Sequence, residues 1–393
     1  MLYSNLDKLK LQLDSLAVFR GLLSDDVVAS LYNYLDNPTV RGYSDFVAKL
    51  YRANMGNLSK HINSICENDE NVYVKAIGNG DSVPEYLSQC VKNELQILQS
   101  VAELSAEELC QPLEWSEALP KFCSDSISLF DNYTHRTKNI GKYGYGAYAK
   151  HSMFYVDDIG SIVPVNNPDP TRLSDLLDYK REQQIIIDNT KALLEGKPAA
   201  NILLTGDAGT GKSSTIKAVT NELFSEGLRI IEMSKDKLSV IPKILNELAD
   251  NPLKFIIFID DLSFLKDDDN FNALKAVLEG SVSAKSKNVV IYATSNRRHI
   301  IRETFGERGD DDVHRNETMQ EIISLSERFG IHITFQKPNK DTFLRIVYGL
   351  AEAKGIDMPK EELAAQAERM ALERGGRSAR LAKQYIDYLL SAK

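Results

Sequence analysis

The sequence predicts an α/β fold, with a five-stranded parallel sheet and a C-terminal helical lid, preceded by a mostly α-helical N-terminal domain. In the second half of the chain, short apolar runs rich in β-branched residues alternate with helical segments. These runs lack polar alternation, which is typical of strands covered by helices on both faces. The predicted strands are residues 202–205, 229–232, 255–259, 289–293 and 331–335. Residues 341–392 show three amphipathic helix patterns and no strand pattern, which predicts the lid.

Length and composition are those of a soluble chain with more than one domain. The 393 residues exceed the roughly 150 of a typical domain, and no apolar run reaches the roughly 18 residues of a membrane helix. The N-terminus is charged early and lacks an apolar signal segment, which predicts a cytoplasmic protein with no membrane partner. The net charge of −9 argues against a protein that coats nucleic acid. The four cysteines form no CxxC pair, which predicts buried thiols and no zinc site.

Residues 1–138 are predicted to form the helical N-terminal domain. Ser82 with Glu85, and Ser105 with Glu108, fit the capping box that starts a helix. Apolar positions recur at helical spacing after these caps, so we expect the helices to pack against each other.

Residues 139–170 change to a Gly- and Tyr-rich composition and end in the turn sequence NNPDP. We interpret them as a linker that contains one short strand, at 154–165. The alternative is a loop whose tyrosines dock on a partner.

A phosphate-binding loop is predicted at residues 206–213, GDAGTGKS. The segment matches G-x-x-x-x-G-K-S in full and lies between a predicted strand and a predicted helix, 214–224. Its glycines allow the backbone to wrap around phosphates, and the helix adds its positive N-terminal end. Lys212 would neutralise the β- and γ-phosphates of ATP, and the hydroxyl of Ser213 would ligate Mg²⁺. The predicted ATP-binding residues are Gly206, Asp207, Ala208, Gly209, Thr210, Gly211, Lys212, Ser213 and Ser214.

Two acids follow the apolar strand 255–259 and predict the second anchor of the metal. Asp260 is the candidate that holds Mg²⁺, so the predicted metal-binding residues are Ser213 and Asp260. Asp261 stands where a carboxylate would polarise the attacking water. The nearby acidic run 267–269 indicates a solvated loop rather than a metal site.

The order of these motifs resembles the AAA+ type of P-loop ATPase. The Thr-Ser-Asn that ends a predicted strand is similar to sensor 1, which implies that Asn296 touches the γ-phosphate and the attacking water. SERFG, before the last strand, is similar to the segment of the arginine finger, which implies that role for Arg328. A surface salt bridge is the alternative for this arginine. Most members of the superfamily carry Glu at the place of Asp261, and the shorter Asp implies slow hydrolysis.

Two further segments resemble parts of the same machinery. GGRSAR opens the last predicted helix and is similar to sensor 2, which implies Arg377 as its arginine, with Arg380 one turn further on the same face. LSDLLDYK, ahead of the phosphate loop, is similar to the stretch that cradles adenine. It implies Leu176 and Tyr179 as base contacts, with Asp178 in place of the usual Gly.

More narrowly, the segments IDDLSF, LKAVLEG, YATSNRRH and LSERFG are similar to the bacterial ATP-binding group called domain of unknown function 815. The resemblance covers about residues 172–393. It implies a nucleotide-binding domain at 171–338 and a helical lid at 339–393, with ATP and Mg²⁺ as cofactors. The group implies no particular substrate or client.

An arginine finger acts on the ATP of a neighbouring subunit, so the resemblance implies a homo-oligomer, as a ring or spiral. The expected function is an ATPase that couples hydrolysis to remodelling or loading of an unidentified protein or nucleic-acid client. The alternatives are a slow nucleotide-gated switch or scaffold and a non-catalytic ATP-binding module. Residues 234–248 contain no aromatic residue and no glycine, which argues against threading through a pore. The basic cluster after Asn296 indicates a solvated loop or a contact with nucleic acid or a subunit, through Arg297, Arg298, His299 and Arg302.

Overall fold

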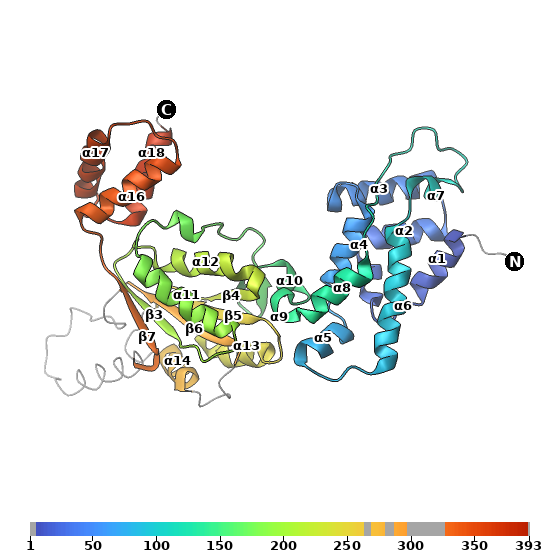
Figure 1. Ribbon diagram of the computed structural model, residues 1–393, viewed down its shortest axis with the longest axis horizontal. Coiled ribbons are helices and arrows are strands. Elements are labelled where there is room, and N and C mark those ends of the chain that lie inside the picture. Colours follow the sequence, from blue (N-terminus) through green and yellow to red (C-terminus); the bar gives the residue numbers. More distant parts are fainter. Residues whose placement is uncertain (1–4, 263–268, 280–286, 297–326, 392–393) are drawn as a thin grey trace. The chain divides into compact units, whose positions relative to one another are not determined.

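The computed structural model describes residues 5–262, 269–279, 287–296 and 327–391, with the backbone alone at 269–272 (Figure 1). The basic cluster after Asn296 and most of the acidic run 267–269 lie outside the described residues. The chain divides into two compact units, Met1–Lys150 and His151–Lys393. Among the described residues, no helix combines the length and the apolar character needed to cross a bilayer.

Helices build the first unit, as its amphipathic patterns predict. They are α1 (Asn5–Asp14), α2 (Asp26–Asp36), α3 (Val40–Asn54), α4 (Leu58–Glu67), α5 (Val72–Asn79), α6 (Glu85–Ala102), α7 (Ala106–Cys110), α8 (Leu129–Lys138), α9 (Ile140–Tyr143) and α10 (Ala147–Lys150). The capping box of Ser105 and Glu108 is formed at α7. The box expected at Ser82 and Glu85 is wrong, because α6 begins directly after Pro84 and Ser82 therefore lies ahead of the cap.

A buried carboxylate ties distant parts of the first unit together. Glu94 of α6 is only 3% exposed. Its oxygens accept the backbone N–H groups of Ala17, Val18 and Phe19, at 2.9 to 3.1 Å. Charged hydrogen bonds of this kind are among the stronger ones in proteins, so Glu94 fixes the chain after α1 against α6.

The second unit contains one sheet of seven strands in the order β2-β1-β4-β5-β6-β3-β7. The strands are β1 (Met153–Val156), β2 (Ile162–Pro164), β3 (Ile202–Gly206), β4 (Leu228–Met233), β5 (Lys254–Ile259), β6 (Val289–Ser295) and β7 (Ile331–Phe335). All neighbours are parallel except the antiparallel pair β1 and β2. The five predicted strands are all present, as β3 to β7.

The predicted count of five strands is wrong, because β1 and β2 extend the sheet beyond β4. The single strand expected at 154–165 is a hairpin. Asp157 turns the chain by accepting the N–H groups of Ile159 and Ser161 on its carboxylate, and Gly160 adopts a φ of 76°. Both strands lie within the segment interpreted as a linker and belong to the compact second unit.

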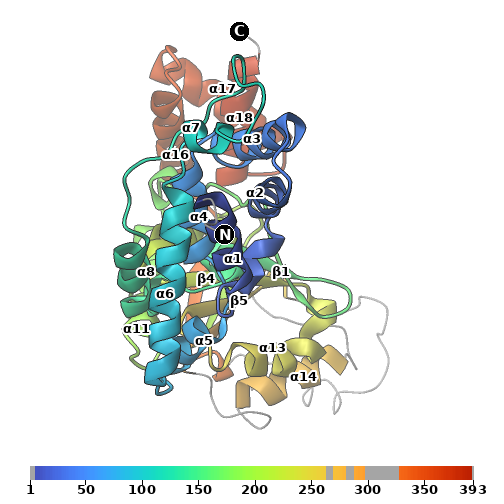
Figure 2. The same ribbon diagram turned by 90° about the vertical axis from the view of Figure 1, so that its right-hand side faces the viewer.

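Helices cover both faces of this sheet (Figure 1, Figure 2). On one face lie α11 (Lys180–Leu194) and α12 (Lys212–Leu223), and on the other lie α13 (Ile241–Leu248) and α14 (Asp269–Glu279). Ile186 and Ile216 of the first pair pack with Leu204 and Phe258 of the strands in one buried cluster. The lid consists of α16 (Lys340–Ala353), α17 (Lys360–Glu373) and α18 (Ala379–Ser391), which bury an apolar cluster of their own.

Candidate functional site

Several predicted site residues meet at the carboxyl-terminal edge of the sheet. Strands β5, β6 and β3 are adjacent and parallel, so the segments that follow them emerge at the same edge. After β3 comes the loop 206–211, after β5 come Asp260 and Asp261, and after β6 comes Asn296. Ligands of open α/β sheets bind in this position.

The loop 206–211 adopts a backbone that only glycine accepts readily. Gly206, Gly209 and Gly211 have φ values of 137°, 77° and 96°. At Gly206 a Cβ atom would lie 2.0 Å from the carbonyl oxygen of Phe335, so the close approach of β7 also requires glycine. The hydroxyl of Thr210 donates to the carbonyl of Asp207 at 2.9 Å and closes the loop.

The other loop residues surround this turn. Asp207 and Ala208 are exposed, whereas Thr210 is buried. The helix α12 begins at Lys212, with Gly211 as its N-cap, so Ser213 and Ser214 lie in its first turn. The N–H groups of a first helical turn have no partner within the helix, which makes this end suitable for an anion.

Lys212 is buried within the loop, at 5% exposure. Its ammonium donates to the carbonyls of Gly206 at 2.8 Å and Asp207 at 2.9 Å, and to Oδ1 of Asn296 at 3.0 Å. Burial lowers the pKa of Lys212, and the nearby carboxylates of Asp260, Asp207 and Asp261 oppose that shift. The lysine is thus a cation held at the centre of the loop by polar groups.

Ser213 and Asp260, the two predicted metal ligands, are in direct contact. The hydroxyl of Ser213 donates to Oδ1 of Asp260 at 2.7 Å, and the Asp260 side chain faces solvent. One hydroxyl and one carboxylate fit Mg²⁺, which prefers oxygen ligands and takes most of the others from water and phosphate. Within the described residues no group of three or more His, Cys, Asp or Glu side chains gathers in metal-binding fashion.

Asp261 stands at the same edge in a rare backbone conformation. Its φ of 53° lies in the left-handed region, where Asp and Asn are enriched over other non-glycine residues. The predicted departure from Glu therefore has a structural reason, because this turn favours the shorter acid. Asn296 donates its Nδ2 group to Oδ1 of Asp261 at 2.8 Å and so links this carboxylate to Lys212.

The two other predicted catalytic residues, Arg328 and Arg377, pair with glutamates. Arg328 forms an ion pair with Glu279, at the end of α14, with 2.5 Å between Nη2 and Oε1. Arg377 donates to both carboxylate oxygens of Glu368 on α17, at 2.7 and 2.5 Å. This bidentate pair lowers the pKa of Glu368, chiefly through the hydrogen bond.

Arg380 of α18 is an arginine of the lid that contacts the phosphate loop. Its backbone N–H donates to the carbonyl of Gly209 at 3.1 Å. A Cβ atom on Gly209 would lie 3.1 Å from the Cβ of Arg380, and the charge of Arg380 contributes to the lowered pKa of Lys212. Sequence reasoning preferred Arg377 on glycine spacing, although Arg380 was visible one turn further along the helix.

The predicted adenine segment lies beside the loop. Tyr179 has a φ of 64°, packs on Phe335 at 5.1 Å between ring centroids, and donates its hydroxyl to the carbonyl of Gln336 at 2.6 Å. Burial, helped by the carboxylates of Asp178, Glu182 and Asp207, raises the pKa of Tyr179 to about 12. The carbonyl of Leu176 accepts from Lys180 and Gln183, which orders the segment. Asp178 pairs with Arg345 of the lid at 3.1 Å.

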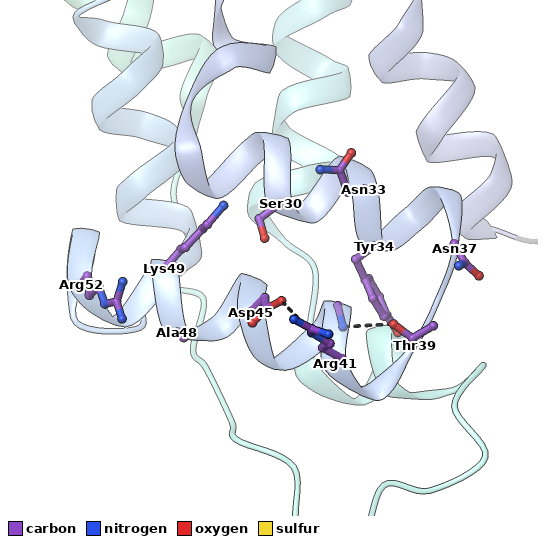
Figure 3. Close-up of a pocket in the computed structure, with 11 residues that line it drawn as sticks. Ser30, Asn33, Tyr34, Asn37, Thr39, Arg41, Asp45, Ala48, Lys49 and Arg52 are labelled. Carbon is purple, nitrogen blue, oxygen red and sulfur yellow. Dashed lines mark hydrogen bonds and ion pairs between the residues drawn. The ribbon is translucent and has the colours of Figure 1, made fainter.

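The first unit has a separate hollow of about 470 Å³, between α2 and α3 (Figure 3). Polar side chains dominate its lining, and Arg41 and Asp45 form a long ion pair of 4.0 Å across one turn of α3. The lining residues are Ser30, Asn33, Tyr34, Asn37, Thr39, Arg41, Gly42, Asp45, Ala48, Lys49 and Arg52. It lacks the glycine loop and the paired acids of the second unit, and no sequence motif marked it.

Comparison with known proteins gives two matches. The family model described as "Protein of unknown function (DUF815)" matches residues 149–393, which is more than half of the chain and includes the hairpin β1–β2. A replication factor C small subunit of Thermoplasma volcanium is 34% identical over 102 residues, covering 23% of this chain and 31% of that protein. The chain thus matches about a third of the length of this curated relative.

Proposed function

The chain belongs to the family described as protein of unknown function DUF815, which is of the AAA+ P-loop type, and from that premise we propose that it is a Mg²⁺-dependent ATPase that remodels or loads a macromolecular partner. The observation that carries the proposal is the bonded network of Lys212, Asn296 and Asp261 beside the pair of Ser213 and Asp260. It brings an ammonium, an amide, a hydroxyl and two carboxylates together around one glycine loop.

Each member of this network has a chemical task in phosphoryl transfer. Lys212 would exchange the carbonyls of Gly206 and Asp207 for the β- and γ-phosphates of ATP, and Ser213 and Asp260 would hold Mg²⁺. The bound metal would supply positive charge that neutralises the phosphates.

Asn296 and Asp261 would act on the attacking water. Asn296 would orient this water, and the carboxylate of Asp261 would accept a proton from it. The oxygen of the water would then bond to the γ-phosphorus while the bond between that phosphorus and ADP breaks. The two residues already share a hydrogen bond of 2.8 Å and face solvent, so a water can reach them.

The arginines would complete the site from other parts of the assembly. We propose that Arg328 leaves Glu279 to contact the ATP of a neighbouring copy, so the working form is a homo-oligomeric ring or spiral. In the lid, Arg380 is the candidate that responds to nucleotide, because it already contacts Gly209; Arg377 could act only after Glu368 releases it. The client would be a cytoplasmic protein or nucleic-acid complex.

Binding calorimetry with Mg-ATP tests the central claim. The wild-type chain should bind Mg-ATP, and Lys212→Ala should weaken binding by about 100-fold or more, because the phosphates lose their buried cation. Lys191→Ala, at an exposed position of α11, is the matched control and should bind as the wild type does. Magnesium-dependent binding that is absent in the wild type, or unchanged in Lys212→Ala, would contradict the proposal.

A slow nucleotide-gated switch is the second candidate, and one observation favours it. Asp261 is shorter than Glu and is engaged by Asn296, so water activation requires rearrangement. Steady-state turnover separates the candidates: cycles of seconds that a client stimulates support remodelling, and cycles of minutes with nucleotide-dependent assembly support the switch. No hydrolysis at any ATP concentration would favour a non-catalytic ATP-binding module.

The variant Arg328→Ala should bind ATP and lose most of its ATP turnover. Full turnover by a monomer of this variant would contradict the role of Arg328 as an arginine finger.

A further inference from the structure

Thr294 occupies the position of β6 at which the neighbouring strand ends. The register of β5 with β6 runs to Ile259, opposite Ala293, so the next residue of β6 faces the segment that leaves β5. That segment continues to dock on Thr294, because the N–H of Leu262 donates to its carbonyl at 2.7 Å. The side chain of Thr294 is 2% exposed, between the core of the sheet and the candidate site.

The hydroxyl of Thr294 bridges the two acids. It bonds to Oδ1 of Asp260 at 2.5 Å and to the backbone N–H of Asp261 at 3.0 Å. The direction of both bonds is fixed, because an ionised carboxylate only accepts and an amide N–H only donates. The hydroxyl of Thr294 therefore donates a hydrogen bond to Asp260 and accepts one from the N–H of Asp261.

These bonds affect two features that a magnesium-dependent ATPase needs here. One is a free carboxylate oxygen on Asp260, and the other is a fixed backbone conformation at Asp261. In the described contacts of Asp260, Ser213 at 2.7 Å, the Asp261 N–H at 3.2 Å and Thr294 all donate to Oδ1, which leaves Oδ2 for the water shell of a cation. Asp261 has its φ of 53°, which costs free energy in a residue other than glycine and persists only where contacts hold it. Thr294 and Leu262 supply two such contacts.

A purely structural reason for Thr294 is weak. Valine has the same shape, favours strands more strongly, and would bury no hydroxyl. Among the described residues, the hydroxyl is satisfied through Asp260 and Asp261, both of which face solvent at the candidate site.

We propose that Thr294 is the positioning residue of this site, which fixes the magnesium-binding carboxylate and the water-activating carboxylate relative to each other through one buried hydroxyl. The inference rests on the proposed ATPase function. Thr294 touches neither ATP nor the metal; it orients Asp260 and holds the left-handed turn at Asp261. Substitution of a residue that hydrogen-bonds to a metal ligand commonly lowers metal affinity or activity by about 10- to 100-fold.

The test compares Thr294→Val, Thr294→Ala and Thr294→Ser in the full chain, by ATPase rate, Mg²⁺ dependence, Mg²⁺-free ATP binding and thermal unfolding. Without the hydroxyl, in Val and Ala, kcat should fall about 10- to 100-fold and half-activation should need about 10-fold more Mg²⁺, whereas Mg²⁺-free ATP affinity should stay within about threefold. Ser, which restores the hydroxyl, should recover kcat and Mg²⁺ dependence to within about threefold of the wild type. Ala is a second variant without the hydroxyl, so the test does not depend on the folding of Val alone.

Thr220→Val is the matched control. Thr220 is fully buried on α12, and its hydroxyl donates to the carbonyl of Ile216, one turn earlier in its own helix. This variant should keep wild-type kcat and Mg²⁺ dependence. A folded Thr294→Val or Thr294→Ala with wild-type kcat and Mg²⁺ dependence overturns the inference, as does a Ser variant as impaired as Val. A wild type that binds no Mg-ATP overturns the proposed function itself, which distinguishes the two failures.

Discussion

Each unit of the chain buries a charge that backbone groups satisfy, and the two charges differ in what they hold. In the first unit, the Glu94 carboxylate accepts three N–H groups from residues 75 to 77 positions earlier, which ties α6 to a distant segment. In the second unit, the Lys212 ammonium donates to two carbonyls of its own loop and to Asn296. The partners of Lys212 are groups that a bound phosphate can replace.

Backbone conformation separates the two charges as well. Around Lys212, three loop glycines and Asp261 have positive φ, whereas Ala17, Val18 and Phe19 do not. A buried charge that joins distant segments of unstrained backbone contributes to stability. A buried charge among locally strained residues at the open edge of a parallel sheet indicates a binding site.

The largest expected effect tests the second half of this contrast. Asp261→Asn removes the proposed proton acceptor and keeps a side chain that tolerates left-handed φ, so kcat should fall about 10³-fold. ATP affinity and the thermal unfolding midpoint should stay as in the wild type. Single-turnover ATP hydrolysis, calorimetry and thermal unfolding measure the three quantities. A lower unfolding midpoint with retained turnover would give Asp261 a structural role like that of Glu94, which would contradict the difference between the two units.

Glu94 should show the opposite behaviour. Glu94→Gln replaces a charged acceptor of three backbone N–H groups by a neutral one, and we expect the free energy of unfolding to fall by about 2 kcal/mol. Mg-ATP affinity should not change. Denaturant unfolding measures the loss, and the control is Glu70→Gln, whose half-exposed pair with Lys75 should contribute less than about 0.5 kcal/mol. Equal losses in both variants would contradict the role given to Glu94.

The two lid arginines sharpen the contrast within the second unit. Arg380→Ala should weaken Mg-ATP binding about tenfold, because it removes a positive charge that lies close to Lys212, while the backbone contact with the loop is kept. Arg377→Ala should change affinity less than about twofold, since its guanidinium pairs with Glu368 of the lid in a partly buried contact and not with the phosphate loop. Titration calorimetry on both variants measures the two effects, and the reverse order would favour Arg377 as the arginine of sensor 2.

The smallest effect is expected at the contact of Arg345 with Asp178. Arg345 is well exposed, so Arg345→Ala should cost less than about 1 kcal/mol in the free energy of unfolding. ATP affinity should change less than about threefold, because the ordering of the adenine segment by Lys180 and Gln183 remains. A loss of ATP binding comparable to that in Arg380→Ala would show that this ion pair belongs to the nucleotide site.

The sequence predicted what depends on local pattern. Strands β3 to β7 lie at the expected residues, because buried parallel strands are continuous apolar runs. The glycine loop was recognisable because its residues are adjacent in the chain. The hairpin was missed although Asp157, Asp158 and Gly160 interrupt residues 154–165 with a turn signal. The pairing of β1 with β4 joins distant segments and has no local signal.

Site residues that depend on register could not be predicted. Thr294 matters because β5 stops pairing at Ile259, and no spacing in the sequence shows where a neighbouring strand ends. The choice of Arg377 by glycine spacing could not take account of Glu368, a partner on another helix of the lid. Asp261 was recognised as unusual, but its left-handed backbone became visible only in three dimensions.

The hairpin β1–β2 has a practical consequence for work on the second unit alone. A recombinant fragment begun at residue 171, after the segment interpreted as a linker, would lose the strand that pairs with Ile230 to Glu232. The exposed edge of β4 would then present unpaired backbone groups to other molecules, which promotes aggregation during expression. A fragment begun at His151 keeps that edge covered and is the better starting point for crystallisation.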